Sequence, residues 1–167
     1  SQAKRQVSDR LFLDANVLFT VADNAAGKAA FLFDWQAPER WQLCTSAHAL
    51  EEARRNLQRK YPQFGARLET LSAAVAMVPQ PHIPALPIEL PEKDRPILAA
   101  ALGAKCSHLL TGDRKHFGAF MNKPEHTSGL LIQTVAQYLA TISKNGGDLT
   151  PAPSELDPIV KTTERRI

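Results

Sequence analysis

Four carboxylates, each at the edge of an apolar segment, carry the strongest chemical signal in this sequence. Asp14 directly follows a short apolar run, Asp113 follows the segment 108–112, and Asp94 opens another apolar pattern. Glu52 lies inside a segment with the apolar spacing of a helix. Carboxylates at strand ends and helix starts can meet in one cleft, where a divalent cation offsets their mutual repulsion. The sequence therefore predicts a metal-dependent active site.

Each of these acids also has a simpler structural explanation. Asp94 precedes Ile97 by three residues, so it shares the core-facing side of the expected helix, but an aspartate there also suits the helix macrodipole. Asp113 follows Gly112, which allows a tight turn out of a strand, and an acid at that place can cap the next helix. Four such acids together favour a functional site over four unrelated structural roles.

Glu52 has an acidic neighbour, Glu51, and the helical pattern separates the two. At about 100° per residue, Glu52 borders the apolar stripe of the helix expected over 47–60, whereas Glu51 points further into solvent. We therefore prefer Glu52 as the ligand, and the sequence alone leaves Glu51 open. The alternative for either residue is an exposed helix acid that pairs with Arg55.

The types of ligand indicate the metal. Carboxylate oxygens are hard ligands, so Mg²⁺ or Mn²⁺ is favoured over zinc. The eight glycines form no phosphate-cradling pattern, and no serine lies in a nucleophile elbow. Cys44 and Cys106 belong to no metal-binding motif, so we expect two buried free thiols.

Composition bounds the class of protein. The 167 residues, 44% of them hydrophobic and 22% charged, are typical of one globular domain with a substantial core. No apolar run approaches the roughly 18 residues of a membrane span, so we expect no membrane contact. Segment 1–6 is polar and lacks the apolar stretch of a secretory signal, so we expect a cytoplasmic protein.

The positions of the basic residues say more than the formal net charge of +3. Basic side chains flank two of the carboxylates and cluster on the helix that carries Glu52. A basic rim around an acidic pocket suits a polyanion that is held by its backbone and cut in the middle. The candidates for binding RNA phosphates are Arg54, Arg55, Arg59, Arg95, Arg114 and Lys115.

Short apolar strands alternate with helices along the chain, which predicts an α/β fold with a parallel sheet covered on both faces. Strands are expected over 10–14, 42–45, 76–78, 108–111 and 129–132. Helices are expected over 16–21, 25–35, 47–60, 64–74, 92–105, 114–121 and 134–143. We expect a polar leader over 1–9, a single domain over 10–145 and a flexible tail over 146–167.

Four segments of the chain resemble the PIN-domain family, and their order and spacing fit over about 10–143. These segments are 13–18, 50–53, 93–101 and 110–117. The resemblance implies a three-layer α/β/α sandwich with strand order 3-2-1-4-5. It also implies a metal-dependent site that hydrolyses single-stranded RNA. Many bacterial members are toxins of VapC-type pairs, in which an antitoxin enters the site, and dimerisation is common in the family.

The resemblance also assigns roles to residues. Asp14, Glu52, Asp94 and Asp113 match the family's acidic, catalytic and metal-binding positions. Asn16 and Thr111 match polar positions that support the acids. His116 matches a position that often holds a histidine. We place it with these supporting residues, although the resemblance gives it no more defined role.

Taken together, the sequence predicts a Mg²⁺- or Mn²⁺-dependent endoribonuclease, the toxin of a toxin–antitoxin pair. One alternative is a catalytically inert PIN-like module that binds RNA or protein, but an inert copy has no need for a repulsive cluster of acids. The other is a receiver-like phosphoacceptor, which needs an acidic pair near the first strand and a lysine after the last. The segment 130–134 contains no lysine, so this reading ranks last.

Overall fold

A five-stranded parallel sheet forms the centre of the protein, seen in the computed structural model, which describes residues 8–83 and 85–144. The strands are β1 (Asp9–Leu13), β2 (Trp41–Ser46), β3 (Ala76–Val78), β4 (His108–Leu110) and β5 (Leu131–Gln133). Their order is β3-β2-β1-β4-β5, and each neighbouring pair is parallel. The predicted fold class and strand order are therefore confirmed.

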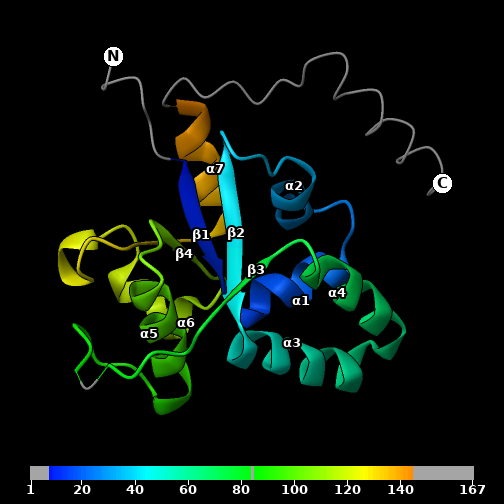
Figure 1. Ribbon diagram of the computed structural model, residues 1–167, viewed down its shortest axis with the longest axis horizontal. Helices are drawn as coiled ribbons and strands as arrows, with labels where there is room; N and C mark the ends of the chain where they lie inside the picture. The colour runs from blue at the N-terminus through cyan, green and yellow to red at the C-terminus, as the bar shows by residue number, and fades with distance from the viewer. Residues whose placement is uncertain (1–7, 84, 145–167) are drawn as a thin grey trace.

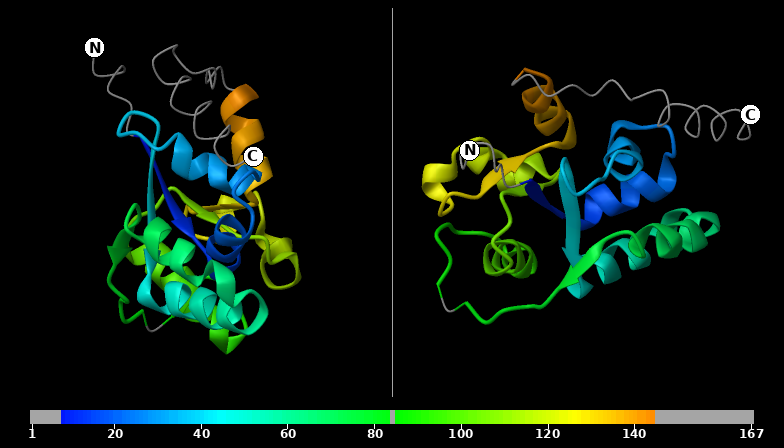
Figure 2. Two further views of the ribbon diagram at one scale, coloured as in Figure 1. Left: turned by 90° about the vertical axis from the view of Figure 1, so that its right-hand side faces the viewer. Right: turned by 45° about the horizontal axis from the view of Figure 1, so that its top comes forward.

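Helices cover both faces of this sheet. They are α1 (Ala15–Asp23), α2 (Lys28–Asp34), α3 (Ala47–Lys60), α4 (Gly65–Ser72), α5 (Arg95–Gly103), α6 (Arg114–Phe117) and α7 (Val135–Lys144). In Figure 1, α1, α3 and α4 lie to the right of the sheet and α5 and α6 to its left. The right-hand view in Figure 2 keeps this separation. Within the described residues, no helix combines the length and apolar character needed to cross a membrane.

Three helices begin within four residues of the end of a strand, each with a side-chain cap. Asp14 accepts a hydrogen bond from the backbone N–H of Ala15, and Ser46 accepts one from Ala49. Asp113 accepts one from His116. Such caps satisfy backbone donors that the first helical turn leaves free. Because parallel strands all point the same way, these helix starts gather at the carboxyl edge of the sheet.

Some boundaries differ from the sequence-based prediction. The helix expected from residue 25 begins at Lys28, because Asn24 accepts a hydrogen bond from the N–H of Ala26 and holds a turn. The helix expected over 92–105 opens with a 3₁₀ turn (Glu92–Asp94) and ends before Lys105, whose φ of 56° is left-handed. The strand expected over 129–132 begins only at Leu131.

The domain boundaries overlap the described residues only in part. Asp9, predicted as the last residue of the leader, is already the first residue of β1. The tail predicted over 146–167 lies outside the described residues.

The core lies on both sides of the central strand. Leu11, Phe12 and Leu13 of β1 are fully buried. Cys44 and Cys106, which are 62 residues apart in the sequence, meet with their Sγ atoms 3.3 Å apart and remain free thiols. This confirms the expected pair of buried free cysteines.

Gly103, the last residue of α5, packs closely against the loop that leads to Asp94. A Cβ atom added at Gly103 would lie 2.7 Å from Cγ of Pro81. We therefore expect Gly103→Ala to lower the free energy of unfolding by about 1–3 kcal/mol, because the proline ring has to move. Gly65→Ala is the matched control, since a Cβ there meets nothing within 4 Å and should stabilise the protein by about 0.4–1 kcal/mol. Urea unfolding of both variants checks the prediction, and equal midpoints would contradict it.

Candidate active site

The four predicted acids come from different elements and line one cavity of about 400 Å³. Asp14 follows β1, Asp94 precedes α5, Asp113 precedes α6, and Glu52 lies on α3. The full lining is Asp14, Asn16, Thr20, Glu52, Lys93, Asp94, Gly112 and Asp113. The cavity opens at the carboxyl edge of the sheet, where ligands bind in open parallel α/β sheets. Four stretches that are distant in the sequence therefore contribute to one site.

Asp14 is the most deeply buried of the acids and the best supported by hydrogen bonds. Its Oδ1 accepts from the N–H of Ala15 at 2.7 Å, and its Oδ2 accepts from Oγ1 of Thr111 at 2.8 Å and from Nδ2 of Asn16 at 3.2 Å. Burial nevertheless raises the pKa of Asp14 from 3.8 to about 6, with smaller contributions from the charges of Glu52 and Asp94. Without a cation, this carboxylate is held in an unfavourable electrostatic environment.

Asn16 and Thr111 join the ends of β1 and β4. Besides binding Asp14, Thr111 Oγ1 accepts from Asn16 Nδ2 at 3.2 Å and from the N–H of Asp113 at 3.1 Å. Asn16 Oδ1 accepts from the N–H of Gly112 at 2.7 Å. These bonds fix Asp14 relative to Asp113. The geometry is what a supporting role for Asn16 and Thr111 requires.

We expect Thr111→Val to weaken metal binding about 10- to 100-fold, as loss of a group that orients a ligand does. The free energy of unfolding should fall by about 1–3 kcal/mol, because buried polar partners lose their hydroxyl. Thr111→Ser keeps the hydroxyl and is the control. Titration calorimetry with Mn²⁺ measures the affinity, and equal affinities for the valine and serine variants would contradict this role.

His116 lies between two of the acids. Its Nδ1 is 2.8 Å from Oδ2 of Asp113 and 3.1 Å from Oδ2 of Asp94. A hydrogen on Nδ1 can point at only one carboxylate, and the hydrogen-bond geometry is good only to Asp113. Oδ2 of Asp94 is therefore left buried without a hydrogen bond. A buried acceptor without a donor is costly unless something else, such as a cation, binds it.

The environments of Asp94 and Asp113 differ. Burial raises the pKa of Asp94, although His116 and Lys93 act in the opposite direction. Burial also acts to raise the pKa of Asp113, but hydrogen bonds from the backbone N–H and the ring of His116 bring it below its usual value. Asp94 makes no side-chain cap to α5, so helix capping does not account for its place.

The donor set fits a small divalent cation. Asp94, Asp113 and His116 each offer a ligand atom, and these atoms all lie within 4.8 Å of one another. Ligands at about 2.0–2.1 Å on opposite sides of Mg²⁺ are separated by about 4 Å, so a small contraction suffices. The unpartnered oxygen of Asp94 is directed into this group. His116, predicted only as a supporting residue, lies where it could itself be a ligand, through a ring nitrogen that carries no hydrogen.

The structure separates the two neighbouring glutamates. Glu51 is exposed and forms ion pairs with Arg54 at 3.5 Å and Arg55 at 3.8 Å. Glu52 is partly buried and lines the acidic cavity. This arrangement favours Glu52 as the fourth acid and gives Glu51 the surface role that was the alternative for either residue.

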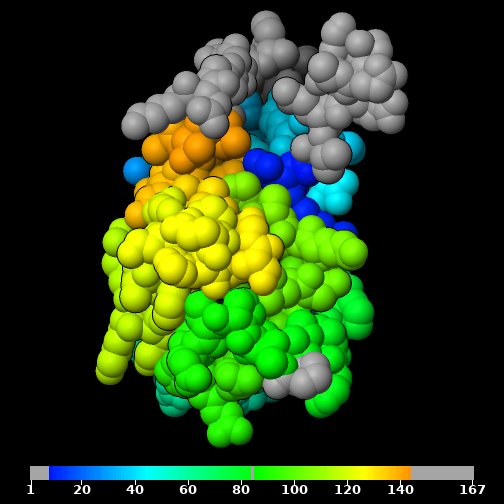
Figure 3. Space-filling model, turned by 90° about the vertical axis from the view of Figure 1, so that its left-hand side faces the viewer, coloured from blue at the N-terminus to red at the C-terminus, as the bar shows by residue number. Residues whose placement is uncertain are grey.

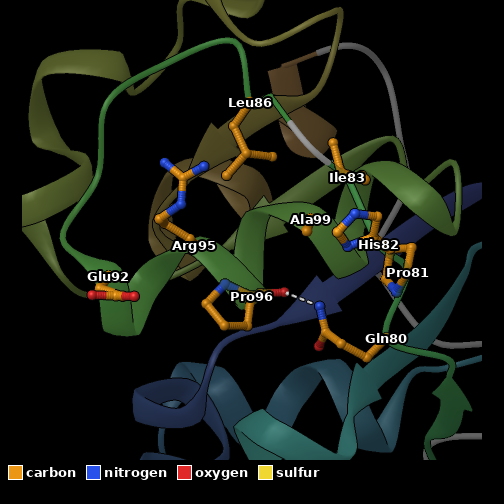
Figure 4. A pocket seen from close by; sticks show the side chains of 9 residues that line it. All are labelled: Gln80, Pro81, His82, Ile83, Leu86, Glu92, Arg95, Pro96 and Ala99. Atoms are coloured by element: carbon orange, nitrogen blue, oxygen red, sulfur yellow. Dashed lines mark hydrogen bonds between the residues drawn. The ribbon is translucent and has the colours of Figure 1, made fainter.

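The predicted basic residues differ in whether a carboxylate already binds them. Arg54 binds Glu69 through two hydrogen bonds of 2.7 and 2.9 Å, so its charge is already matched. Arg114 and Lys115 are exposed beside Asp113. Arg95 lines a second cavity of about 270 Å³ between α5 and the loop 79–91, where Gln80 bonds to the carbonyl of Pro96 (Figure 4). Figure 3 shows the face of the molecule that α5 and this loop form together with the segment that follows α6.

Three residues that line the acidic cavity were not among the predicted site residues: Thr20, Lys93 and Gly112. Thr20 lies one helical turn after Asn16 on α1, and this spacing was an available signal. Lys93 directly precedes Asp94, and its carbonyl is 3.3 Å from Nε2 of His48. Lys93 therefore brings a positive charge to the acids while its backbone contacts α3.

The fold and the site define an α/β/α protein with an acidic cavity at the carboxyl edge of a parallel sheet. The profile of the PIN domain matches residues 10–115. The chain belongs to the PIN-domain family.

Solved structures agree with this fold. VapBC-1 from nontypeable Haemophilus influenzae has a chain with 17% identity and a TM-score of 0.51, and the match covers 76% of this chain and 98% of that one. VapBC2 from Rickettsia felis was solved bound to a DNA fragment from its promoter. A chain of that structure has 12% identity and a TM-score of 0.52, and the match covers 75% of this chain and 98% of that one. No curated protein matches the sequence significantly.

Proposed function

We propose that this protein is a Mg²⁺- or Mn²⁺-dependent endoribonuclease that hydrolyses single-stranded RNA. The observation that carries the proposal is the convergence of Asp14, Glu52, Asp94 and Asp113 on one cavity at the carboxyl edge of the sheet. Membership of the PIN-domain family supports the same reaction class. An acidic cavity would repel RNA phosphates unless cations were bound in it.

The residues of the site would have different roles. Asp94, Asp113 and His116 would hold one ion, and Asp14 with Glu52 would complete the cluster. When bound, such ions polarise a phosphodiester and lower the pKa of water. Thr111 and Asn16 hold Asp14 in place, and Lys93 offers a positive charge to a phosphate at the mouth of the cavity. Arg95, Arg114 and Lys115 rank ahead of Arg54 and Arg55 for binding phosphates, because the last two already have carboxylate partners.

A partner protein forms the second part of the proposal. The chains of similar fold come from VapBC complexes, which supports a toxin that a cognate antitoxin keeps inactive. An antitoxin segment that enters the cavity would exclude RNA. A homodimer stays a prediction of the family resemblance.

The direct test is cleavage of a labelled single-stranded RNA pool of random sequence, with Mn²⁺, with Mg²⁺ and with EDTA. We expect fragments only with the metals, and no cutting of the same RNA annealed into a duplex. A thermal shift with Mn²⁺ measures metal binding independently of cleavage. If Mn²⁺ stabilises the protein while no RNA is cut, the inert binding module replaces the nuclease. Cutting that EDTA leaves unchanged would exclude the proposed site.

A further inference from the structure

Three aromatic rings form a group at the end of α3 that the proposed catalytic site does not use. We call Phe19, Tyr61 and Phe64 the aromatic group. The ring centroids of Phe19 and Tyr61 are 6.0 Å apart at 52°, and those of Tyr61 and Phe64 are 6.2 Å apart at 61°. Neither neighbour therefore stacks in parallel on Tyr61, so no ring covers a face of Tyr61 in the way that a nucleobase would.

Tyr61 is unusually accessible for a large apolar side chain. It is 40% exposed, and among the described residues only Met77 is another exposed large hydrophobic residue. Part of its ring surface is therefore available for contact.

Positive charge accompanies the rings. Nζ of Lys60 lies 5.8 Å from the ring centroid of Phe19. Arg59 bonds to the neutral side chain of Asn56, at 3.0 Å, so this contact leaves its charge unmatched. An accessible aromatic ring beside lysine and arginine is the combination that binds single-stranded nucleic acid, through base stacking and attraction of the phosphates.

The aromatic group connects to the acidic cavity along two helices. Phe19 directly precedes Thr20, which lines that cavity. Helices α1 and α3 pack against each other, as Figures 1 and 2 show. Glu52 and Tyr61, the residue that follows α3, are nine residues apart, which is about 13 Å along the helix axis at 1.5 Å per residue. About four stacked nucleotides at 3.4 Å each span that axial length, and RNA that reaches both residues also has to pass around the helix, because nine residues turn it by about 180°.

We propose that Tyr61, supported by Phe19 and flanked by Lys60, stacks on a base of single-stranded RNA a few nucleotides from the scissile phosphate. This inference rests on the proposed ribonuclease function and adds a positioning site to it. Duplex RNA keeps its bases paired and cannot place one on the ring. The subsite would therefore contribute to selection of single-stranded substrates. The adjacent cations favour RNA over an apolar protein segment as the occupant.

The test separates base stacking from apolar packing. Tyr61→Leu keeps apolar bulk without a π face, Tyr61→Phe keeps the ring, and Met77→Ala removes the other exposed hydrophobic residue. Affinity for a short fluorescein-labelled oligouridine is measured by anisotropy in the Asp14→Asn background. We expect Tyr61→Leu to bind about 5- to 100-fold more weakly, the range for loss of one stacking ring, and the other two variants to bind as the background does.

Cleavage provides a second measurement. Tyr61→Leu should lower kcat/KM for the oligouridine by a similar factor and leave hydrolysis of bis(p-nitrophenyl) phosphate unchanged, because that small diester reaches only the acids. An equal loss with both substrates would overturn the proposal, since the effect would then be structural. Unchanged RNA binding by Tyr61→Leu would also overturn the proposal. This holds as well if Tyr61→Leu loses binding to a protein partner instead. If the wild type binds oligouridine without cutting any substrate, the ribonuclease function fails while weaker binding by Tyr61→Leu still supports the stacking site.

Discussion

Asp14→Asn should reduce metal-dependent RNA cleavage at least about 10²-fold, because it removes a ligand charge from the centre of the site at nearly constant volume. Asp14 is the most deeply buried acid of the cavity. It accepts hydrogen bonds from Ala15, Asn16 and Thr111, and the charges of Glu52 and Asp94 in the same cavity act on it. The measurement is the initial rate of fragment formation in Mn²⁺, compared with the wild type at equal protein concentration.

The same substitution should leave the metal-free protein folded and at least as stable as the wild type. Burial places the pKa of Asp14 near 6, so its charge at neutral pH opposes folding, and the neutral amide removes that charge. Asp14→Asn should therefore lose cleavage activity without losing stability. Glu51→Gln is the matched control, since Glu51 is an exposed neighbour of the site with arginine partners. Undiminished cleavage by Asp14→Asn, or equal losses in both variants, would reject the assignment of Asp14.

The fold was predictable because its signals are local and repeated. Apolar strands, caps such as Ser46 and breaks such as Pro62 fixed most elements within a few residues. The strand order came from the family resemblance, since a sequence pattern does not show which strands pair. Boundary errors occurred where a side chain bonds to nearby backbone, as Asn24 does, or where a residue takes a left-handed conformation, as Lys105 does.

The sequence predicts which acids line the cavity better than it predicts how they are arranged there. The four acids stand out because each interrupts an apolar pattern, and the structure brings all four to one cavity. The position of His116 between Asp94 and Asp113 depends on how α5 and α6 approach each other, which no local pattern specifies. The contact between Cys44 and Cys106 depends on tertiary packing in the same way.

Rising pH should destabilise the metal-free protein, and a bound metal ion should stabilise it. Burial raises the pKa of both Asp14 and Asp94, so in the metal-free protein burial makes the ionised form of each carboxyl less favourable than it is in water. For Asp14, the stabilising contribution is complete below its unfolded pKa of 3.8 and is lost as pH rises through about 6. The loss amounts to about 3 kcal/mol between about pH 4 and 7, at 1.36 kcal/mol per pKa unit.

We therefore expect the metal-free wild type to lose stability relative to Asp14→Asn as pH rises from about 4.5 to 7.5, in urea unfolding with EDTA. The comparison isolates Asp14, because all other groups titrate in both proteins. Mn²⁺ should reverse the trend by binding only the ionised carboxylates, and it adds about 2.7 kcal/mol when present at 100 times its Kd. At about pH 4.5 the same Mn²⁺ concentration should have a smaller effect, because Asp14, with a pKa of about 6, is then protonated. A difference between the two proteins that does not vary with pH would show that Asp14 is not held as the structure places it. Stabilisation by Mn²⁺ that is equal at both pH values would locate the ion away from these carboxylates.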